Sequence, residues 1–224
     1  MIIICGIIGF TSPHVTSKDL KVIKQVMIES RIRGKHASGI AWFDGQKLQS
    51  YIKPIAIDEL LKKFDLDQVV HNGQVSMIAH ARYSTSDIRY NQPIVGDSMA
   101  IVHNGVITQT DPKTWTKQFG YTCKTQNDSE LILRAVENGD NPLVKFSDSS
   151  IAALILDNTG QLCYMRNAQR PLWMGNVGKG IVYASTYDIL QRSGVTRIGK
   201  IIASDYKDLQ RRNYQQWETH KQQA

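Results

Sequence analysis

Hydrophobic and polar positions alternate along the chain with two different spacings, which predict both strands and helices. Short apolar runs rich in β-branched residues predict strands at residues 2–10, 75–83, 99–102, 180–185 and 197–203. Apolar residues three and four positions apart predict helices at residues 19–31, 58–64 and 129–137. Turn sequences predict two hairpins, one joining residues 38–43 to 47–52 through Asp44-Gly45 and one joining residues 150–156 to 161–166. Short strands and a few helices, without a repeat or an internal linker, predict one layered α+β domain.

The two ends of the chain differ from the middle. Residues 1–10 are apolar, but the run is shorter than the roughly 20 residues of a membrane span, and no basic residue precedes it as in a signal peptide. We therefore interpret this run as a buried strand and expect a cytoplasmic protein with no membrane partner. Residues 206–224 are polar and rich in Gln, which predicts either a docked helix or a polar tail.

Composition and charge exclude several classes of protein. Hydrophobic residues make up 42% and charged residues 21% of the 224 positions, which excludes a disordered chain. The net charge of +7 leaves an acidic partner open, but no nucleic-acid-binding motif is present, so a nucleic-acid partner is not expected. The three cysteines, Cys5, Cys123 and Cys163, include no Cys-x-x-Cys pair. This argues against a disulfide framework or a thiolate zinc site and favours a reducing compartment.

Two residues near the ends of predicted strands are candidates for a catalytic or substrate-binding role. Cys5 is followed by Gly6, which lets other groups approach the backbone closely, yet a lone cysteine in an apolar strand is more often a core residue. Arg82 ends the strand at residues 75–83 within His80-Ala81-Arg82-Tyr83-Ser84-Thr85. Its guanidinium is suited to a bidentate pair with a substrate carboxylate, or to an ordinary surface salt bridge.

Two further strings each allow a structural and a functional interpretation. The tripeptide His-Asn-Gly occurs at residues 71–73 and 103–105, and Asn-Gly is most often a hairpin turn. One copy could instead place a backbone N–H and an Asn amide against a developing oxyanion. At residues 127–130, Asn127 or Asp128 is a good helix N-cap, while the carboxylate could alternatively hold a substrate ammonium.

The order of these strings carries more information than any one of them. From Cys5 onward the chain reads CGIIGF, RGKHASG, HARYST, NQP, AIVHNG, NDSE, RNAQRPL and YAS, in that succession. This ordered set resembles the class II glutamine amidotransferases, whose glutaminase domains are N-terminal-nucleophile hydrolases. The resemblance extends from Cys5 to about Ser185.

The resemblance implies roles for the residues that match the family's motifs. Cys5, followed by Gly6, matches the nucleophile. Arg82 matches the arginine that binds the α-carboxylate of glutamine, with the Thr85 hydroxyl beside it. Asp128 matches the carboxylate that binds the α-ammonium.

A second set of matches concerns the oxyanion and the supporting residues. In AIVHNG, Asn104 and Gly105 match the oxyanion hole, which leaves the earlier copy, at residues 71–73, as a plain turn. The string RGKHASG departs from the family pattern, because His36 and Ala37 stand where the family prefers an acid or amide and then a serine. The positions expected to support the site are Arg33, Gly34, His80 and His103.

The resemblance also implies a fold and domain limits. The fold is the four-layer αββα arrangement, with two stacked antiparallel sheets between helical layers. The amidotransferase domain is expected at residues 5–205. Residues 1–4 are expected to be a propeptide, because in this family the α-amine of the nucleophile is the base, and an amide nitrogen in a peptide bond has no useful basicity.

The implied function is hydrolysis of the side-chain amide of L-glutamine through a cysteinyl thioester, without a cofactor or a metal. Too little chain follows Ser185 for a synthase domain, so we expect a standalone glutaminase whose ammonia passes to a separate synthase partner. Two alternatives stay open: a hydrolase of small γ-glutamyl amides, and a catalytically idle binding or regulatory protein in which Cys5 is never freed. Comparing the amines released tests the first, and retention of residues 1–4 in the native protein tests the second.

Overall fold

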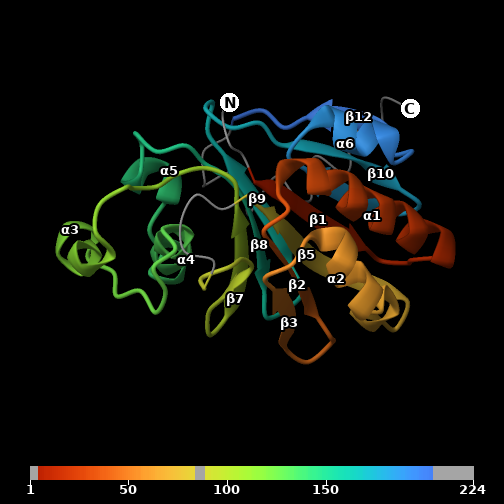
Figure 1. The fold of residues 1–224 in the computed structure, drawn as a ribbon, viewed down its shortest axis with the longest axis horizontal. Coiled ribbons are helices and arrows are strands. Elements are labelled where there is room, and N and C mark those ends of the chain that lie inside the picture. Colours follow the sequence, from red (N-terminus) through yellow and green to blue (C-terminus); the bar gives the residue numbers. More distant parts are fainter. Residues whose placement is uncertain (1–4, 84–88, 204–224) are drawn as a thin grey trace.

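The computed structural model of the 224-residue chain describes residues 5–83 and 89–203. Three expectations from the sequence, the propeptide at residues 1–4, the role of Thr85 and the nature of residues 206–224, lie outside the described residues. The described part is an α+β structure in which two antiparallel sheets stack between helices, as predicted (Figure 1).

The larger sheet consists of strands from residues 6–82 and 173–200. Its principal path runs β12-β10-β11-β1-β5-β2-β3, with β4 paired to β5, and every pairing is antiparallel. Its strands are β1 (Gly6–Ser12), β2 (Ala37–Phe43), β3 (Leu48–Lys53), β4 (Val70–His71), β5 (Gln74–Arg82), β10 (Trp173–Val177), β11 (Gly180–Ala184) and β12 (Thr196–Lys200).

The smaller sheet has the order β6-β7-β8-β9 and is also antiparallel. Its strands are β6 (Ile94–Val95), β7 (Met99–His103), β8 (Ala152–Asp157) and β9 (Leu162–Arg166). The long connection between β7 and β8 contains the helices of this half of the molecule.

Helices cover the outer faces of the two sheets (Figure 1). Over the larger sheet lie α1 (Ser17–Glu29), α2 (Ile57–Lys63) and α6 (Tyr187–Arg192), with the short 3-10 helices η1 (Ser30–Arg33) and η2 (Leu66–Val69). Beside the smaller sheet lie η3 (Pro112–Thr114), α3 (Trp115–Phe119), α4 (Ser129–Glu137) and α5 (Pro142–Lys145). None of the helices in these described ranges is long and apolar enough to cross a membrane.

Alternation along β1 shows how the layers are held together. Ile7 is fully buried in the cluster that joins the two sheets and α4, whereas Ile8 and Phe10 are fully buried in the cluster beneath α1, α2 and α6. Successive side chains of a strand point to opposite faces, so a central strand with both faces covered reads as a continuous apolar run. The sequence Ile7-Ile8 is explained by this double burial.

Most of the predicted elements are present, with bounds shifted by one to a few residues. The first predicted strand begins at Gly6 among the described residues, and both predicted hairpins are confirmed. The sequence did not predict the short elements β4, β6, α3 and α5, nor the longer β10 and α6. Strand β10 contains a glycine and an asparagine and gains its pairing from β11 and β12, and α6 has only six residues, too few to show a helical period.

Candidate functional site

Cys5 lies immediately before β1, a central strand of the larger sheet. Its neighbour Gly6 pairs with Ala81 of β5, and the Cys5 thiol Sγ lies 3.8 Å from the carbonyl oxygen of Tyr83. A side chain at Gly6 would bring its Cβ to 3.1 Å from the Cβ of Arg33, closer than most such contacts. Glycine after the cysteine therefore allows η1 to pack directly against the start of β1.

The charges around Cys5 come from three different elements. Burial raises the pKa of the Cys5 thiol, the positive charges of Arg82 and Arg33 oppose that rise, and the charge of Asp128 adds to it. The net effect is an elevated pKa, so the thiol is protonated at neutral pH and needs a base before it can act as a nucleophile.

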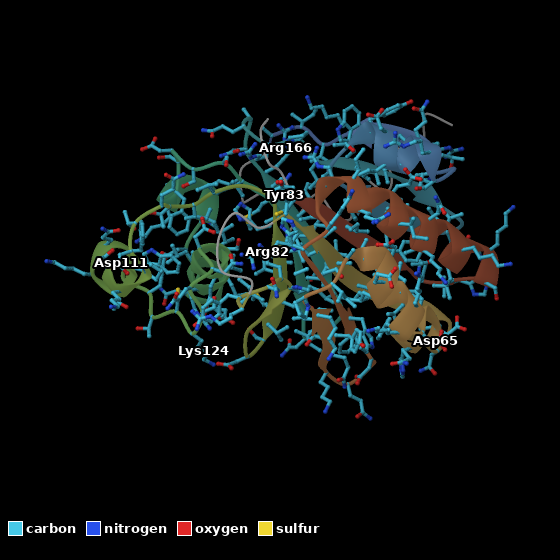
Figure 2. All side chains as sticks on the ribbon, viewed as in Figure 1. Asp65, Arg82, Tyr83, Asp111, Lys124 and Arg166 are labelled. Atoms are coloured by element: carbon cyan, nitrogen blue, oxygen red, sulfur yellow. The ribbon has the colours of Figure 1, made fainter. Side chains whose placement is uncertain are left out.

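Arg82 is the last residue of β5 and is buried. Its Nη1 donates to the carbonyl oxygen of Tyr90 at 2.9 Å and to Oδ1 of Asn91 at 2.6 Å. Figure 2 shows Arg82 and Tyr83 near the middle of the molecule, between the α4 side and the α1 and α2 side. The guanidinium is therefore buried and held by the segment that follows β5, and its positive charge acts on Cys5.

Asn104 and Gly105 follow β7 directly, and they do not form a turn. The backbone of Asn104 exchanges two hydrogen bonds with Ala152, of 2.8 and 3.2 Å, and so continues the pairing of β7 with β8. The Asn104 side chain is buried, and within the described structure its Nδ2 has no hydrogen-bond partner. Buried amide groups are nearly always paired, so this donor is available for a ligand.

Close packing explains why residue 105 is a glycine. A Cβ at this position would overlap the carbonyl oxygen of Ser150 and would lie 2.6 Å from Nε2 of His103. Only a residue without a side chain lets the backbone pass between these two groups.

Asp128 stands at the N-terminus of α4, but its carboxylate does not cap the helix. Its Oδ2 accepts hydrogen bonds from the backbone N–H groups of Ile107 (2.6 Å) and Thr108 (3.3 Å). Asn127 provides the local bond instead, because its Oδ1 accepts from the N–H of Ser129 at 3.1 Å. The carboxylate of Asp128 is thus turned toward the segment that follows Asn104 and Gly105.

The two histidines expected to support the site are both buried. Neither ring nitrogen of His80 makes a hydrogen bond of normal geometry within the described residues, although the backbone of His103 lies nearby, and burial lowers its pKa to about 3. Burial also lowers the pKa of His103, whose ring lies between Ser129 Oγ (2.9 Å from Nδ1) and the carbonyl oxygen of Ser150 (3.1 Å from Nε2). Both rings are therefore neutral at pH 7.

Arg33 ends η1, Gly34 follows it, and the charge of Arg33 acts on Cys5. The Arg33 side chain has two buried nitrogens, Nε and Nη2, without a partner in the described structure, and burial lowers its pKa. A side chain at Gly34 would overlap the backbone of Arg82 and Tyr83. His36 belongs to RGKHASG, the string that departs from the family pattern. Its ring packs against the ring of Tyr83, with the two centroids 4.8 Å apart.

Several residues around the site were not singled out from the sequence as site residues. Gln92, Ser129 and Ser150 bond to the His103 residue, and Ser185 Oγ accepts from the backbone N–H of Ile7 at 2.9 Å. The strings NQP, NDSE and YAS contain Gln92, Ser129 and Ser185. The order of motifs therefore included these residues but did not predict which groups they contact.

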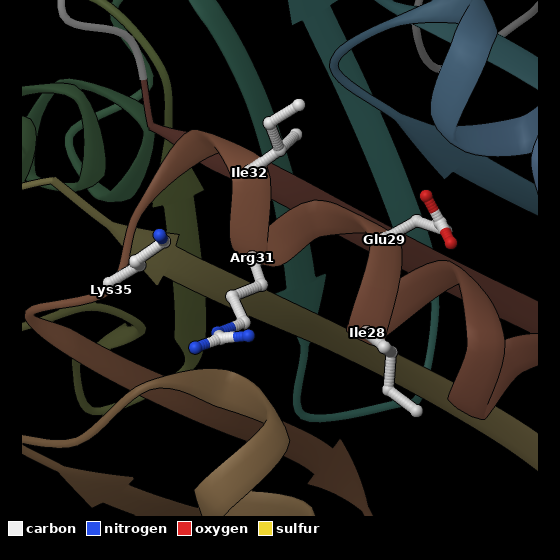
Figure 3. Close-up of a pocket in the computed structure, with 5 residues that line it drawn as sticks. All are labelled: Ile28, Glu29, Arg31, Ile32 and Lys35. Carbon is white, nitrogen blue, oxygen red and sulfur yellow. The ribbon is translucent and has the colours of Figure 1, made fainter.

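A separate hollow lies on the outer face of α1 and η1. Its volume is about 320 Å³, and Figure 3 shows its lining residues, Ile28, Glu29, Arg31, Ile32 and Lys35. None of the candidate site residues lines it, so we do not count it as part of the site. Across residues 5–83 and 89–203, no three His, Cys, Asp or Glu side chains gather as a metal site.

The profile of a family described as "Glutamine amidotransferase domain" matches residues 80–192, half of the chain and most of the site. The chain belongs to this family, in its class II branch. Among curated relatives, the glutamine–fructose-6-phosphate aminotransferase of Bartonella henselae is 32% identical over 150 residues, which cover 62% of this chain and 23% of the relative. The Escherichia coli K12 enzyme of the same name is 25% identical over 138 residues, 59% of this chain and 22% of the relative. The matched part of the amidotransferase domain thus spans about a quarter of these relatives.

Solved structures show the same fold. Glutamine phosphoribosylpyrophosphate amidotransferase from B. subtilis, complexed with ADP and GMP, superimposes with a TM-score of 0.68 at 23% identity, covering 89% of this chain and 46% of that one. A class-II glutamine aminotransferase domain protein from Silicibacter pomeroyi gives a TM-score of 0.51 at 14% identity, covering 81% of this chain and 88% of that one. The amidotransferase domain therefore has the N-terminal-nucleophile hydrolase fold that its motif order predicts.

Proposed function

We propose that this amidotransferase domain hydrolyses the side-chain amide of L-glutamine to glutamate and ammonia, with Cys5 as the nucleophile. The observation that carries the proposal is the buried Nδ2 of Asn104 beyond the end of β7, which has no hydrogen-bond partner among residues 5–83 and 89–203. A buried donor without a partner is costly to keep, and an oxyanion that forms during the reaction would give it one.

Activation of the thiol begins with its raised pKa. Since Cys5 is protonated at neutral pH, a base must accept its proton during attack. The α-amine of Cys5 itself, with an ordinary pKa of about 7.7–8.0, is suited to this task. We infer that residues 1–4 are removed, because the Ile4–Cys5 peptide bond leaves no such amine.

The reaction then follows a thioester route. The Cys5 sulfur attacks the side-chain carbonyl carbon of glutamine, and the carbonyl oxygen becomes an oxyanion that accepts hydrogen bonds from Asn104 Nδ2 and the Gly105 N–H. Collapse of this intermediate breaks the C–N bond, and the protonated α-amine returns its proton to the departing ammonia. Water next attacks the thioester carbon, which releases glutamate and restores the thiol.

The two ends of the amino acid are recognised by opposite charges. Arg82 binds the α-carboxylate, with Thr85 contributing its hydroxyl, and Asp128 binds the α-ammonium. Both charged groups are already held by neighbouring backbone or amide groups, so little conformational freedom is lost on binding. A ligand lacking either charge would lose one of these two ionic contacts, which selects free glutamine.

The ammonia is proposed to pass to a separate acceptor. The curated relatives, named as aminotransferases acting on glutamine and fructose-6-phosphate, are about four times as long as the segment they share with this chain. Their names pair glutamine with a second substrate in an amino-group transfer, which supports an acceptor for the ammonia released here.

Labelling with the glutamine-analogue electrophile 6-diazo-5-oxo-L-norleucine, followed by intact mass measurement, tests the proposal. We expect one adduct, located on Cys5 in molecules that begin at Cys5, and none in Cys5→Ala. Cys123→Ala and Cys163→Ala are matched controls that should label fully, and burial raises the pKa of Cys123 to about 12, which makes it unreactive. Label on either of these cysteines, or retention of residues 1–4 in fully active protein, would contradict the mechanism.

The same preparation distinguishes glutamine from larger amides. We expect ammonia release from glutamine to exceed amine release from γ-glutamyl methylamide or γ-glutamyl anilide. The opposite order would replace glutamine with a γ-glutamyl conjugate as the substrate while leaving the role of Cys5 intact.

A further inference from the structure

Three buried side chains and one backbone carbonyl form a continuous set of hydrogen bonds beside the candidate site. Nε2 of Gln92 donates to Ser129 Oγ at 3.0 Å, and Ser129 Oγ lies 2.9 Å from Nδ1 of His103. Nε2 of His103 lies 3.1 Å from the carbonyl oxygen of Ser150. The backbone N–H of His103 donates to Oε1 of Gln92 at 2.6 Å, so Gln92 bonds both to Ser129 and to His103.

The chemistry of these groups determines where each proton lies. The Ser150 carbonyl can only accept, so Nε2 of His103 carries the hydrogen. Because burial keeps the ring neutral, Nδ1 has a free lone pair and accepts from the Ser129 hydroxyl. The Ser129 oxygen in turn accepts from the Gln92 amide, and every group in the set is paired.

This set touches both ends of the candidate site. His103 precedes Asn104 and Gly105, and Nε2 of His103 lies beside the position where a Cβ of Gly105 would stand. Ser129 follows Asp128 at the start of α4. The ring of His103 therefore joins the loop that carries the oxyanion donors to the helix that carries the ammonium-binding carboxylate.

We propose that His103 is a positioning residue, held as its neutral Nε2–H tautomer by Ser129 and Gln92, that sets the direction of the Asn104 and Gly105 donors relative to Asp128. The proposal rests on the proposed glutaminase function. His103 touches neither the substrate nor the reacting atoms, and it acts only through the residues that do.

The proposal predicts a particular kinetic signature. The oxyanion donors matter in the transition state, so misdirecting them lowers kcat with little effect on KM. Asp128 keeps its own bonds to Ile107 and Thr108 when the histidine moves, so ground-state binding is preserved. Misplacement of catalytic groups by about 1 Å costs up to roughly 10²-fold in rate.

The test compares Ser129→Ala with Ser129→Thr and with Ser193→Ala. We expect Ser129→Ala to lower kcat about 10- to 100-fold and to change KM less than about threefold, while Ser129→Thr, which keeps the hydroxyl, recovers most of kcat. Ser193 is a matched control: it is a buried serine whose Oγ donates to the Ile189 carbonyl at 2.7 Å in the C-terminal part of α6, and its loss should leave kcat and KM unchanged. Thermal unfolding of all three variants checks that each one folds.

A second measurement examines the tautomer directly. The ¹⁵N chemical shifts of the His103 ring should show a protonated Nε2 and an unprotonated Nδ1 in the wild type, with the Nδ1 shift altered in Ser129→Ala. An Nδ1–H tautomer, or an active Ser129→Ala variant whose kcat and KM match those of Ser193→Ala, would overturn the inference alone. Wild-type protein that neither hydrolyses glutamine nor labels at Cys5 would overturn the proposed function, and the two failures are therefore distinguishable.

Discussion

The tripeptide His-Asn-Gly has opposite surroundings at its two positions in the chain. At residues 71–73 it connects β4 to β5, and Asn72 and Gly73 adopt φ values of 49° and 74°, the left-handed conformation of a tight hairpin turn. At residues 103–105 it leaves β7 in extended pairing, and Asn104 is only 2% exposed. The same local sequence therefore gives a turn on the surface in one place and a buried strand end in the other.

The difference also appears in how the polar side chains are paired. The exposed Asn72 amide lies 2.8 Å from the ring of His71, so the turn uses its own side chains. Asn104 is held through its backbone by Ala152, and its Nδ2 stays without a partner in the described structure. A buried, unpaired donor whose backbone is fixed is what an oxyanion site requires, and a self-paired surface amide cannot provide it.

The largest expected loss of activity comes from adding a methyl group at Gly105, the glycine of the buried His-Asn-Gly. Gly105→Ala would overlap the Ser150 carbonyl, so the loop must move and the oxyanion donors with it. We expect glutaminase kcat/KM to fall by at least about 10³-fold, with a loss of stability in urea unfolding. Gly73→Ala is the control without a steric overlap: no described atom lies within 4 Å of its added Cβ, so the variant should keep full activity, although its φ of 74° strains an alanine and lowers stability. Near-normal activity of Gly105→Ala would mean that this loop does not carry the oxyanion donors.

The next effect concerns the two asparagines. Asn104→Ala should lower kcat about 10²- to 10³-fold, equivalent to about 3–4 kcal/mol of barrier, with little change in KM. The free energy of unfolding should stay within about 1 kcal/mol of wild type, because no described residue bonds to the Nδ2 donor that is removed. Steady-state kinetics and urea unfolding check this pair of results. A variant that loses stability but keeps kcat would assign Asn104 to the fold and exclude it from the oxyanion site.

A smaller effect concerns the pH dependence of stability at the buried His103. Burial lowers the pKa of His103 in the folded protein, so protonation favours the unfolded chain and stability falls as pH drops below the ordinary histidine pKa of about 6.5. One such group contributes a slope of at most about 1.4 kcal/mol per pH unit. His103→Gln should therefore flatten the dependence of unfolding free energy on pH below about 6.5. Equal slopes for His103→Gln and wild type would contradict the burial of a neutral ring.

The smallest effect is confined to the turn. Asn72→Ala places alanine in a left-handed conformation, which should reduce the free energy of unfolding by about 1 kcal/mol and leave kcat and KM unchanged. Asn72→Gly should restore the lost stability, since glycine adopts this conformation freely. Any fall in glutaminase activity for Asn72→Ala at full folding would show that the turn is coupled to the site.

The sequence predicted the fold well where a residue pattern is local and long enough to read. The hairpin at Asp44-Gly45 and helix α4 were located within one or two residues, because turn chemistry and helical spacing act within a few positions. Strand β10 was missed because its glycine and asparagine weaken the signal and its stability comes from strands on either side. Pairing between distant strands overrides local propensity there.

For the candidate site, the order of the strings predicted which residues belong to it, but not which groups their side chains contact. Helix N-capping was one interpretation of Asp128, and the structure shows its carboxylate bonded to Ile107 and Thr108, with Asn127 bonding the Ser129 N–H. The set of bonds from Gln92 through Ser129 to His103 had no sequence signal beyond the presence of these residues in the ordered strings.

By itself, the sequence determined that this chain alternates strands and helices in an α+β domain and that its strings follow the order of a class II glutamine amidotransferase. Only the tertiary structure decided which His-Asn-Gly is buried, where the carboxylate of Asp128 points and which side chains hold His103. The physical reason is distance along the chain: a turn or a helical period depends on neighbours a few residues away. Whether a polar group is buried, paired or left free depends on strands and loops that meet it from elsewhere in the chain.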